Sequence, residues 1–403
     1  MKLDAVETLD RRPCPACSAA EPDLIFEQRF APVEAASLLS GYDVVACRAC
    51  GCAYADRVPP QAAFDAYYRD LSKYDHAERA GAESPLERER SAAIAADIAS
   101  QIPDRAARIV EIGCSTGGLL AALWAQGFTD LLGMDPSPYS GEAAHRSHRV
   151  RVVTGTLSED LGIGRSADLV VAIGVLEHIR DVGLALQRIR GLLRPGGTLY
   201  VEVPDALRFA DWLDAPYQQF SVEHVTFFSP ESLNRALAGQ GFQFARVAQV
   251  TRAESESSTM PVVAALSTAV ASGVRGAPPP ADARSAPALR QYVARSAAMD
   301  ERIQTEVDRL ARAGRPLLVW GVGTHTARLL VSSRLRQARI CAFIDSNPKM
   351  HGKMLDGIPI LPPEALRARD EPVLISSRVF QDEIAAQIGR LGCANELVFL
   401  YDR

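Results

Sequence analysis

The sequence lacks several features that mark whole classes of protein. Its first residues, MKLDAVETLD, contain no apolar core of signal-peptide length, and no run of about 18 apolar residues follows anywhere in the chain. An excess of positive charge is also missing, because the net charge is −5 and the pI is near 5.9. We therefore expect a cytoplasmic protein with no membrane partner. The acidic balance argues against a protein that grips nucleic acid backbone.

Length and composition describe a globular protein of more than one domain. The chain has 403 residues, of which 47% are hydrophobic and 23% charged. A single core of that size is unusual, so two or three domains are expected. Eight cysteines are present. In a reducing compartment they are better interpreted as metal ligands or buried thiols than as disulfides.

Four of these cysteines form two C-x2-C pairs near the start of the chain. They are Cys14, Cys17, Cys47 and Cys50. Two such pairs a few tens of residues apart can close a tetrahedral four-thiolate site, so we predict a structural Zn²⁺ that folds a small module at residues 1–70. Two unrelated thiol pairs or a redox C-x2-C are the alternatives. Cys52 lies one residue beyond the second pair, next to Gly51, and could substitute as a ligand.

The rest of the chain alternates strand and helix patterns in the α/β manner. We expect an α/β fold with a small N-terminal zinc-binding module, a doubly wound Rossmann-like domain, and a second, smaller Rossmann-like domain. The predicted boundaries are residues 1–70 for the module, 71–255 for the first domain, 256–314 for a connector and long helix, and 315–403 for the second domain.

A glycine-rich loop, EIGCSTGG at residues 111–118, joins the first strand of this domain to its helix. In a dinucleotide loop, G-x-G-x-x-G, the second glycine admits a pyrophosphate, and here that position is Ser115. The loop therefore suits a ligand without phosphates. Asp135 ends the next strand, 22 residues after Gly113, where a carboxylate can accept both ribose hydroxyls. An NAD enzyme is the alternative for this domain.

Together with Glu177-His178 and the RPGG turn at residues 194–197, this pattern resembles the class I S-adenosylmethionine-dependent methyltransferases. In that family the glycine loop carries the methionine part of the cofactor and the acid carries the ribose. The resemblance implies an S-adenosylmethionine site. The residues expected there are Glu111, Gly113, Cys114, Gly117, Asp135, Pro136 and Gly174.

The segment QFSVEHVTFFS, residues 219–229, places an adjacent carboxylate and imidazole in an otherwise apolar stretch. The fifth strand ends near Pro204, and the next helix starts at Ser229. The chain between them leaves from the cofactor edge of the sheet and must cross it. We therefore expect Glu223 and His224 near the methyl donor. A strand-end histidine and a surface charge are the alternatives.

The cysteine pairs, LEHI at 176–179 and SVEHVTFFSP at 221–230 resemble the sugar C-methyltransferases of deoxysugar biosynthesis. That resemblance implies a TDP-linked keto-deoxysugar methylated beside its ketone, with His224 as the base. It also implies that Glu223, His178 and Tyr74 line the pocket. Ser221 departs from the family pattern, which tends to have a tyrosine there, and this keeps a hydroxyl acceptor open.

The C-terminal part carries Gly321, Gly323 and, 24 residues after Gly321, Asp345. Thr326 replaces the third dinucleotide glycine, so the domain is either a nucleotide site or a degenerate fold that walls the substrate pocket. Candidate contacts for an anionic substrate, or else ordinary loop and helix-start residues, are His325, Lys353 and Arg378.

The sequence thus predicts a methyltransferase acting on a small nucleotide-linked sugar, as a monomer or homodimer. An O- or N-methyltransferase acting on another sugar or polar metabolite is the alternative. An RNA methyltransferase and a non-catalytic cofactor-binding scaffold also remain, although no Lys/Arg-rich knuckle supports RNA binding.

Overall fold

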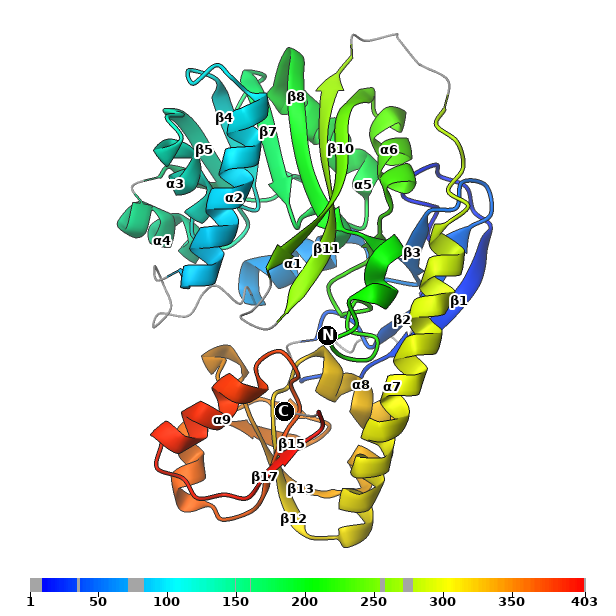
Figure 1. The fold of residues 1–403 in the computed structure, drawn as a ribbon, viewed down its shortest axis with the longest axis vertical. Helices are drawn as coiled ribbons and strands as arrows, with labels where there is room; N and C mark the ends of the chain where they lie inside the picture. Colours follow the sequence, from blue (N-terminus) through cyan, green and yellow to red (C-terminus); the bar gives the residue numbers. More distant parts are fainter. Residues whose placement is uncertain are drawn as a thin grey trace.

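The computed structural model describes most of the chain. The described residues are 9–34, 37–71, 83–148, 150–159, 161–253, 258–270 and 278–401. Tyr74, predicted to line the pocket, lies outside them. No helix within these ranges is long and apolar enough to cross a bilayer. Figure 1 shows two α/β bodies joined along one side by a long helix.

The N-terminal part is a small antiparallel sheet of order β1-β2-β3-β9. Its strands are β1 (Pro22–Arg29), β2 (Gly41–Cys47), β3 (Ala53–Asp56) and β9 (Thr226–Phe227). The helix α1 (Gln61–Leu71) follows β3. Because β9 comes from a distant part of the chain, this module and the segment after residue 205 share one sheet.

The central sheet has seven strands in the order β10-β11-β8-β7-β4-β5-β6. They are β4 (Arg108–Ile112), β5 (Asp130–Asp135), β6 (Val152–Thr154), β7 (Ala167–Ile173), β8 (Leu193–Pro204), β10 (Phe242–Ala253) and β11 (Thr259–Ala269). The five strands from β6 to β8 run parallel, whereas β11 runs antiparallel to both β8 and β10. The carboxyl ends of β4, β5 and β7 therefore meet at one edge.

The strand β11 corrects the expectation for the connector. Residues 254–285 are rich in Ser, Ala and Pro, which favoured a linker, yet TMPVVAALSTA at 259–269 is a sheet strand. The residues at the centre of this strand are buried. The apolar run is short, and the residues around it are typical of a linker. Its partner strand β8 lies far away in the sequence, so local composition alone does not indicate a strand here.

Helices cover both faces of the central sheet. The helices α2 (Pro85–Gln101) and α3 (Gly118–Ala125) share one core with the sheet, and α5 (Val182–Leu192) and α6 (Pro230–Gly239) share the core of the other face. The helix α4 (Pro138–His148) follows β5. Local signals begin two of these helices, because Ser84 and Ser229 each cap the helix that follows, with proline in the first turn.

The C-terminal body is a six-stranded sheet of order β14-β15-β13-β12-β16-β17, parallel except for β14. Its strands are β12 (Pro316–Trp320), β13 (Arg339–Ile344), β14 (Met354–Leu355), β15 (Ile358–Leu361), β16 (Val373–Ile375) and β17 (Leu397–Phe399). One face packs on α7 (Ser285–Ala313) and α8 (Thr324–Ser332), and the other on α9 (Gln381–Arg390). Short 3-10 turns complete the fold, among them η2 (Leu176–His178) and η3 (Ala206–Asp211).

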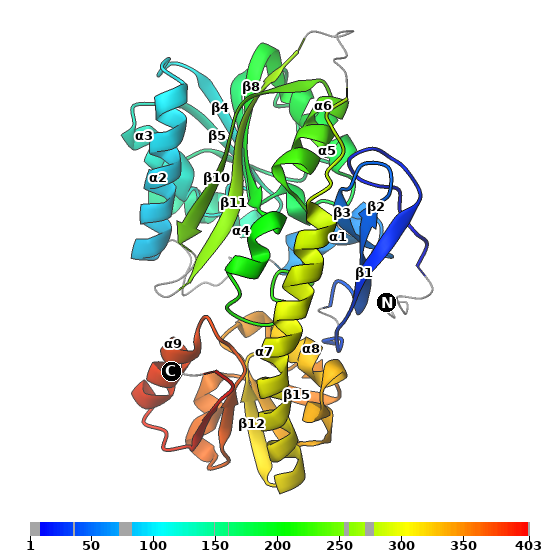
Figure 2. The same ribbon diagram turned by 45° about the vertical axis from the view of Figure 1, so that its right-hand side comes forward.

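The long helix α7 runs beside both bodies, as Figures 1 and 2 show from two directions. Its first half contributes Leu289 and Tyr292 to a core shared with the N-terminal sheet and the segment after β8. Its second half contributes Ile303 and Val307 to the C-terminal core. The predicted fold class is confirmed: an N-terminal cysteine module, a Rossmann-like sheet and a second, smaller Rossmann-like body.

Candidate active site

A cavity opens at the carboxyl edge of the central sheet, where the loops after β4, β5 and β7 meet. From these loops it is lined by Gly113, Ser115, Asp135, Pro136 and Gly174. Gln61, Asp65 and Tyr68 of α1 form a second wall. A third wall, called the acceptor side below, consists of His178 at the end of η2 and Glu223 in the segment before β9. The cavity thus brings together the cofactor loop and part of the EH segment.

The loop after β4 is held in place by Asp135. Its carboxylate accepts hydrogen bonds from the Ser115 amide at 2.9 Å and the Ser137 amide at 2.9 Å. These two bonds fix the carboxylate at the edge of the cavity, which it lines. Ser115 adopts a left-handed φ of +47° and Gly113 one of +71°. A Cβ on Gly113 would meet Val175 at 2.8 Å, so this position requires glycine.

Three predicted cofactor residues lie behind the cavity wall and not on it. Glu111 lies within β4, and its Oε2 is buried without a hydrogen-bond partner in the described part of the chain. Burial first, and then the nearby Asp135 and Glu83, raises the pKa of Glu111 to about 8. Cys114 is buried in the core that includes α3, and Gly117 precedes the first turn of α3.

On the acceptor side, η2 and the segment before β9 are joined by a hydrogen bond from the Val225 amide to the Glu177 carbonyl, at 2.8 Å. The Nδ1 atom of His178 lies 2.9 Å from the Tyr68 hydroxyl and 3.1 Å from the Glu223 carbonyl oxygen. The rings of His178 and His224 meet edge to face, with centroids 4.9 Å apart. The two histidines predicted for the pocket are therefore neighbours.

Ser221, which replaces the expected tyrosine, has a structural task. Its hydroxyl oxygen accepts hydrogen bonds from the amides of Glu223, at 3.2 Å, and His224, at 3.1 Å. Its carbonyl accepts one from the Tyr42 hydroxyl at 2.8 Å. A serine side chain can turn back on its own backbone in this way, whereas a tyrosine cannot. Ser221 thus sets the turn that presents Glu223 and His224.

The site contains two residues to which the sequence analysis gave no role. Tyr67 donates a hydrogen bond to Glu223 Oε1 at 3.2 Å, and Tyr68 contacts His178 as described. Burial and then Glu223 raise the pKa of Tyr67, so its phenol stays protonated and remains a donor. Both tyrosines lie on α1, seven and six residues before the predicted Tyr74. Three tyrosines, Tyr67, Tyr68 and Tyr74, lie close together in the sequence, but nothing local shows which of them faces the sheet edge.

The N-terminal module forms hydrogen bonds with the segment that carries Glu223 and His224. Buried Arg12 donates hydrogen bonds to the carbonyls of Val225, at 2.6 Å, and Arg180, at 2.8 Å. The Ala55 amide of β3 donates to the Val225 carbonyl at 2.9 Å. Burial, followed by the Arg180 charge, lowers the pKa of Arg12 to about 10. Arg12 still stays cationic near neutrality and can satisfy both carbonyls.

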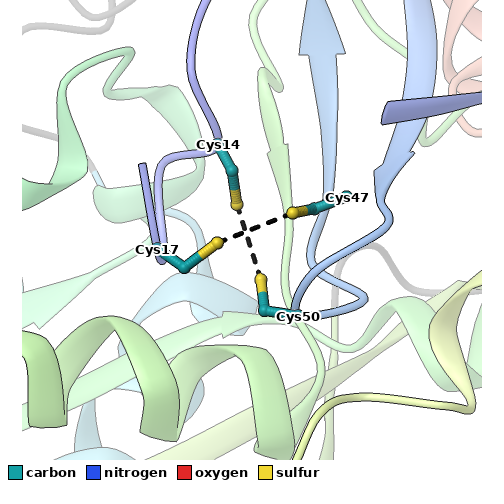
Figure 3. Close-up of side chains that lie close together, drawn as sticks. All are labelled: Cys14, Cys17, Cys47 and Cys50. Atoms are coloured by element: carbon teal, nitrogen blue, oxygen red, sulfur yellow. Dashed lines mark hydrogen bonds between the residues drawn. The ribbon is translucent and has the colours of Figure 1, made fainter. Parts of the chain in front are cut away.

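The four predicted zinc ligands converge. Figure 3 shows their sulfurs pointing toward one centre from two loops, and their Sγ atoms all lie within 4.8 Å of one another. Cys14 and Cys50 are 3.6 Å apart, and Cys17 and Cys47 are 3.5 Å apart. Four thiolates about 2.3 Å from a central zinc would have nearly this spacing, so the residues fit the ion. Cys52 is buried beside them but outside the four-sulfur group.

The three candidates for anion contacts in the C-terminal body do not line the cavity. His325 Nε2 lies 2.9 Å from the Tyr401 hydroxyl, and burial lowers the pKa of His325 to about 3, which leaves the ring neutral. Burial and the neighbouring Lys349 lower the pKa of Lys353. The Arg378 carbonyl accepts a hydrogen bond from the Gln381 amide at 3.5 Å. A neutral His325 is a poor anion ligand.

Comparison with known proteins identifies two parts of the chain. Residues 86–247 match the family described as "Methyltransferase domain", and residues 315–399 match the one described as "C2185-like, N-terminal". The chain is 30% identical over 166 residues to a ubiquinone biosynthesis O-methyltransferase of Azorhizobium caulinodans, covering 38% of this chain and 65% of the relative. It is 34% identical over 117 residues to a trans-aconitate 2-methyltransferase of Methylobacterium radiotolerans, covering 28% of this chain and 44% of the relative. The chain thus spans less than two thirds of each of these relatives.

Among solved structures, similarity extends to a 1,6-didemethyltoxoflavin-N1-methyltransferase of Burkholderia thailandensis with bound 1,6-didemethyltoxoflavin and S-adenosylhomocysteine. The TM-score is 0.41 at 21% identity, covering 62% of this chain and all of that chain. This likeness is too distant to carry an argument about the site. The family match over residues 86–247 does identify a methyltransferase domain around the cavity.

Proposed function

Because residues 86–247 form a class I S-adenosylmethionine-dependent methyltransferase domain, we propose that the protein methylates a small polar metabolite. We further propose that the acceptor is a nucleotide-linked keto-deoxysugar, with TDP as the nucleotide, methylated at the carbon beside its ketone. The observation that carries the proposal is that His178 and Glu223 line the cavity, with the His224 ring in edge-to-face contact with His178.

The residues around the loop fit S-adenosylmethionine. The Asp135 carboxylate lines the cavity at the end of β5, where a carboxylate can accept ribose hydroxyls, and Gly113 lines the cavity beside it. The unpartnered Oε2 of buried Glu111 suits a positively charged group. When bound, the cofactor supplies an electrophilic methyl group on a sulfonium. The protein's own residues orient the acceptor and manage its proton.

His224 is proposed as the general base. A carbon beside a ketone becomes nucleophilic when it loses a proton, and an imidazole titrates close enough to neutrality to take it. His178 is held by the Glu223 carbonyl through Nδ1, and when Nε2 carries a proton it can donate that proton in a hydrogen bond to the developing enolate oxygen. The Tyr67–Glu223 pair is proposed to hold a sugar hydroxyl. His178 and Glu223 line the cavity, His224 contacts His178, and Tyr67 contacts Glu223.

Methylation on oxygen is the second candidate, and two observations favour it. The relatives named above include O-methyltransferases of ubiquinone biosynthesis, and Ser221 stands where sugar C-methyltransferases tend to have a tyrosine. The same base would serve, because a hydroxyl acceptor also loses its proton during transfer. The two reactions differ in whether a carbon-bound hydrogen exchanges with solvent.

The four-cysteine site is proposed to hold a structural zinc ion. A closed set of four thiolates leaves no coordination position for a substrate. Its role would be to fix the module that contacts Val225 through Arg12 and β3. The zinc therefore acts on the reaction only through the position of the segment that carries His224.

The function is tested with the full chain, labelled S-adenosylmethionine and a panel of nucleotide sugars, with products identified by mass. His224→Ala should lower turnover by roughly 10²–10⁴, the usual worth of a positioned base, and keep cofactor affinity. Wild-type protein should also exchange solvent deuterium into the carbon beside the ketone, and the variant should not.

His145, exposed on α4, supplies the matched control, because His145→Ala should leave turnover unchanged. Deuterium exchange at the wild-type rate in His224→Ala would assign the base elsewhere. Transfer onto oxygen with no exchange would replace C-methylation by O-methylation. No transfer to any nucleotide sugar, with transfer to another polar metabolite, would overturn the proposed substrate.

A further inference from the structure

Three metal-ligating side chains gather on the acceptor side, apart from the cysteine cluster. They are Glu177, His178 and His224, and one carboxylate oxygen and two ring nitrogens lie within 4.8 Å of one another. They come from η2 and from the segment before β9, which the Val225–Glu177 backbone hydrogen bond ties together. Imidazole nitrogen and carboxylate oxygen are ligands that divalent transition metals accept, and three protein ligands leave positions open for small molecules.

Glu177 supplies an independent indication of a missing partner. The residue is 2% exposed, and its Oε2 has no hydrogen-bond partner among the residues that the structure describes. A buried carboxylate oxygen left in that state is costly, so a proton or a cation is expected beside it. The other oxygen of this carboxylate, Oε1, lies 3.9 Å from His178 Nε2, so the carboxylate faces that histidine.

The hydrogen bonds of His178 prepare its ring for a cation. Nδ1 lies 3.1 Å from the Glu223 carbonyl oxygen, which can only accept, and 2.9 Å from the Tyr68 hydroxyl, which can accept or donate. In the tautomer that donates to the carbonyl, the proton is on Nδ1 and the lone pair is on Nε2. In this tautomer the Nε2 lone pair and the Glu177 carboxylate, 3.9 Å apart, can both bind one cation. A carbonyl that holds the outer nitrogen while the inner one binds the ion is the usual arrangement around a metal-bound histidine. Ligands about 2.1 Å from an ion lie roughly 3–4 Å apart, so small side-chain rotations would close the group.

We propose that Glu177, His178 and His224 form a binding site for a divalent transition-metal ion of the zinc, cobalt or nickel type. Metal binding itself is independent of the proposed function. Its effect on turnover rests on that function: an ion held by the His224 lone pair prevents this imidazole from accepting a proton. The bound ion is therefore an inhibitor that excludes the acceptor and leaves the cofactor half of the cavity unaffected.

The site is tested by adding Co²⁺ to the purified full chain, removing unbound ion and measuring zinc plus cobalt per chain. Two ions are expected in the wild type, and one each in Glu177→Gln and His178→Ala. The exposed His145→Ala should retain two. Cobalt in a nitrogen and oxygen site lacks the strong thiolate charge-transfer absorption, which separates this ion from one in the cysteine cluster. Unchanged circular dichroism and cofactor affinity in the variants would show that they fold.

A wild-type chain that holds one ion, or variants that still hold two, would overturn the site. In kinetic assays, added Zn²⁺ should act as an inhibitor competitive with the acceptor, and a chelator should restore turnover. Glu177→Gln should weaken this inhibition at least tenfold. Metal binding that raises turnover would keep the site and overturn His224 as the base. Absence of the second ion, combined with the predicted loss of turnover in His224→Ala, would overturn the site and leave the proposed function standing.

Discussion

At the scale of single residues, Glu111 is a buried carboxyl whose charge depends on what binds beside it. Its pKa is raised to about 8, first by burial and then by Asp135 and Glu83, so at pH 7 the unliganded protein holds it mostly protonated. S-adenosylmethionine carries a positive sulfonium and an ammonium group. A positive charge nearby stabilises the carboxylate and lowers its pKa, so binding should release a proton.

We expect calorimetric titrations at pH 7, in buffers of different ionisation enthalpy, to detect release of up to one proton per cofactor bound. The sign follows from the pKa: cofactor affinity should rise with pH between about 6 and 8 and level off above the unliganded pKa. Glu111→Gln should abolish both effects, whereas the exposed Glu142→Gln should preserve them. Proton uptake, or an affinity independent of pH in the wild type, would contradict the role of Glu111.

Residues whose task depends on local sequence were predictable, and those whose task depends on distant contacts were not. The position of Asp135 at the end of a strand was enough to predict that it lies at the site, and in the structure it lines the cavity. Tyr67 and Tyr68 required knowledge of how α1 packs over the sheet edge. The role of Ser221 was visible neither in the residue type nor in the resemblance, because it depends on two backbone amides that follow it.

At the scale of elements, the short strand β9 connects the cysteine module to the acceptor segment. It pairs with β3 through Ala53–Phe227 and Tyr54–Thr226, directly after His224. The sequence indicated the cysteine module, but it could not show that a two-residue strand from residue 226 completes its sheet. Such short pairings have no periodicity of their own. The division proposed from the sequence therefore needs one change, which is to extend the central domain past 255 to include β11.

This connection predicts that zinc loss reaches the active site. Cys47→Ser should prevent binding of the proposed zinc at the cysteine cluster and lower the melting temperature, because structural zinc contributes directly to folding free energy. Turnover should fall as the segment after Ser221 loosens, while cofactor affinity measured by calorimetry should change little. Cys341→Ser, at a partly exposed position of the C-terminal body, is the matched control and should keep zinc and stability. A Cys47→Ser chain that retains full stability without zinc would refute the structural role.

At the scale of the whole molecule, α7 connects three parts of the protein through polar contacts as well as through its cores. Tyr292 and Ser296 accept hydrogen bonds from the amides of Gln219, at 3.0 Å, and Tyr217, at 3.1 Å, so the helix anchors the segment that leads to the active site. One turn later, Asp300 pairs with Arg328 of α8 in the C-terminal body. Motion of one body against the other would have to break these contacts.

The Asp300–Arg328 pair is buried, with side chains that are 13% and 4% exposed, and the guanidinium also lies 5.0 Å above the Tyr217 ring. Arg328→Ala would leave the Asp300 carboxylate buried without its counter-charge, which typically costs about 3–5 kcal/mol. We therefore expect a marked fall in the urea midpoint of unfolding. Because Tyr217 loses its packing partner, the KM for the acceptor should also rise while cofactor affinity stays constant.

A comparison within α7 isolates the effect of burial. Arg309 forms an exposed pair with Glu306 on the same helix, and Arg309→Ala should change stability by less than about 0.5 kcal/mol. The double variant Asp300→Asn with Arg328→Met removes both charges and should be less destabilised than Arg328→Ala alone, because no uncompensated charge remains buried. Equal midpoints for Arg328→Ala and Arg309→Ala would mean that the buried pair does not hold the two bodies together. The shared apolar packing on α7 would then be what joins the C-terminal body to the active site.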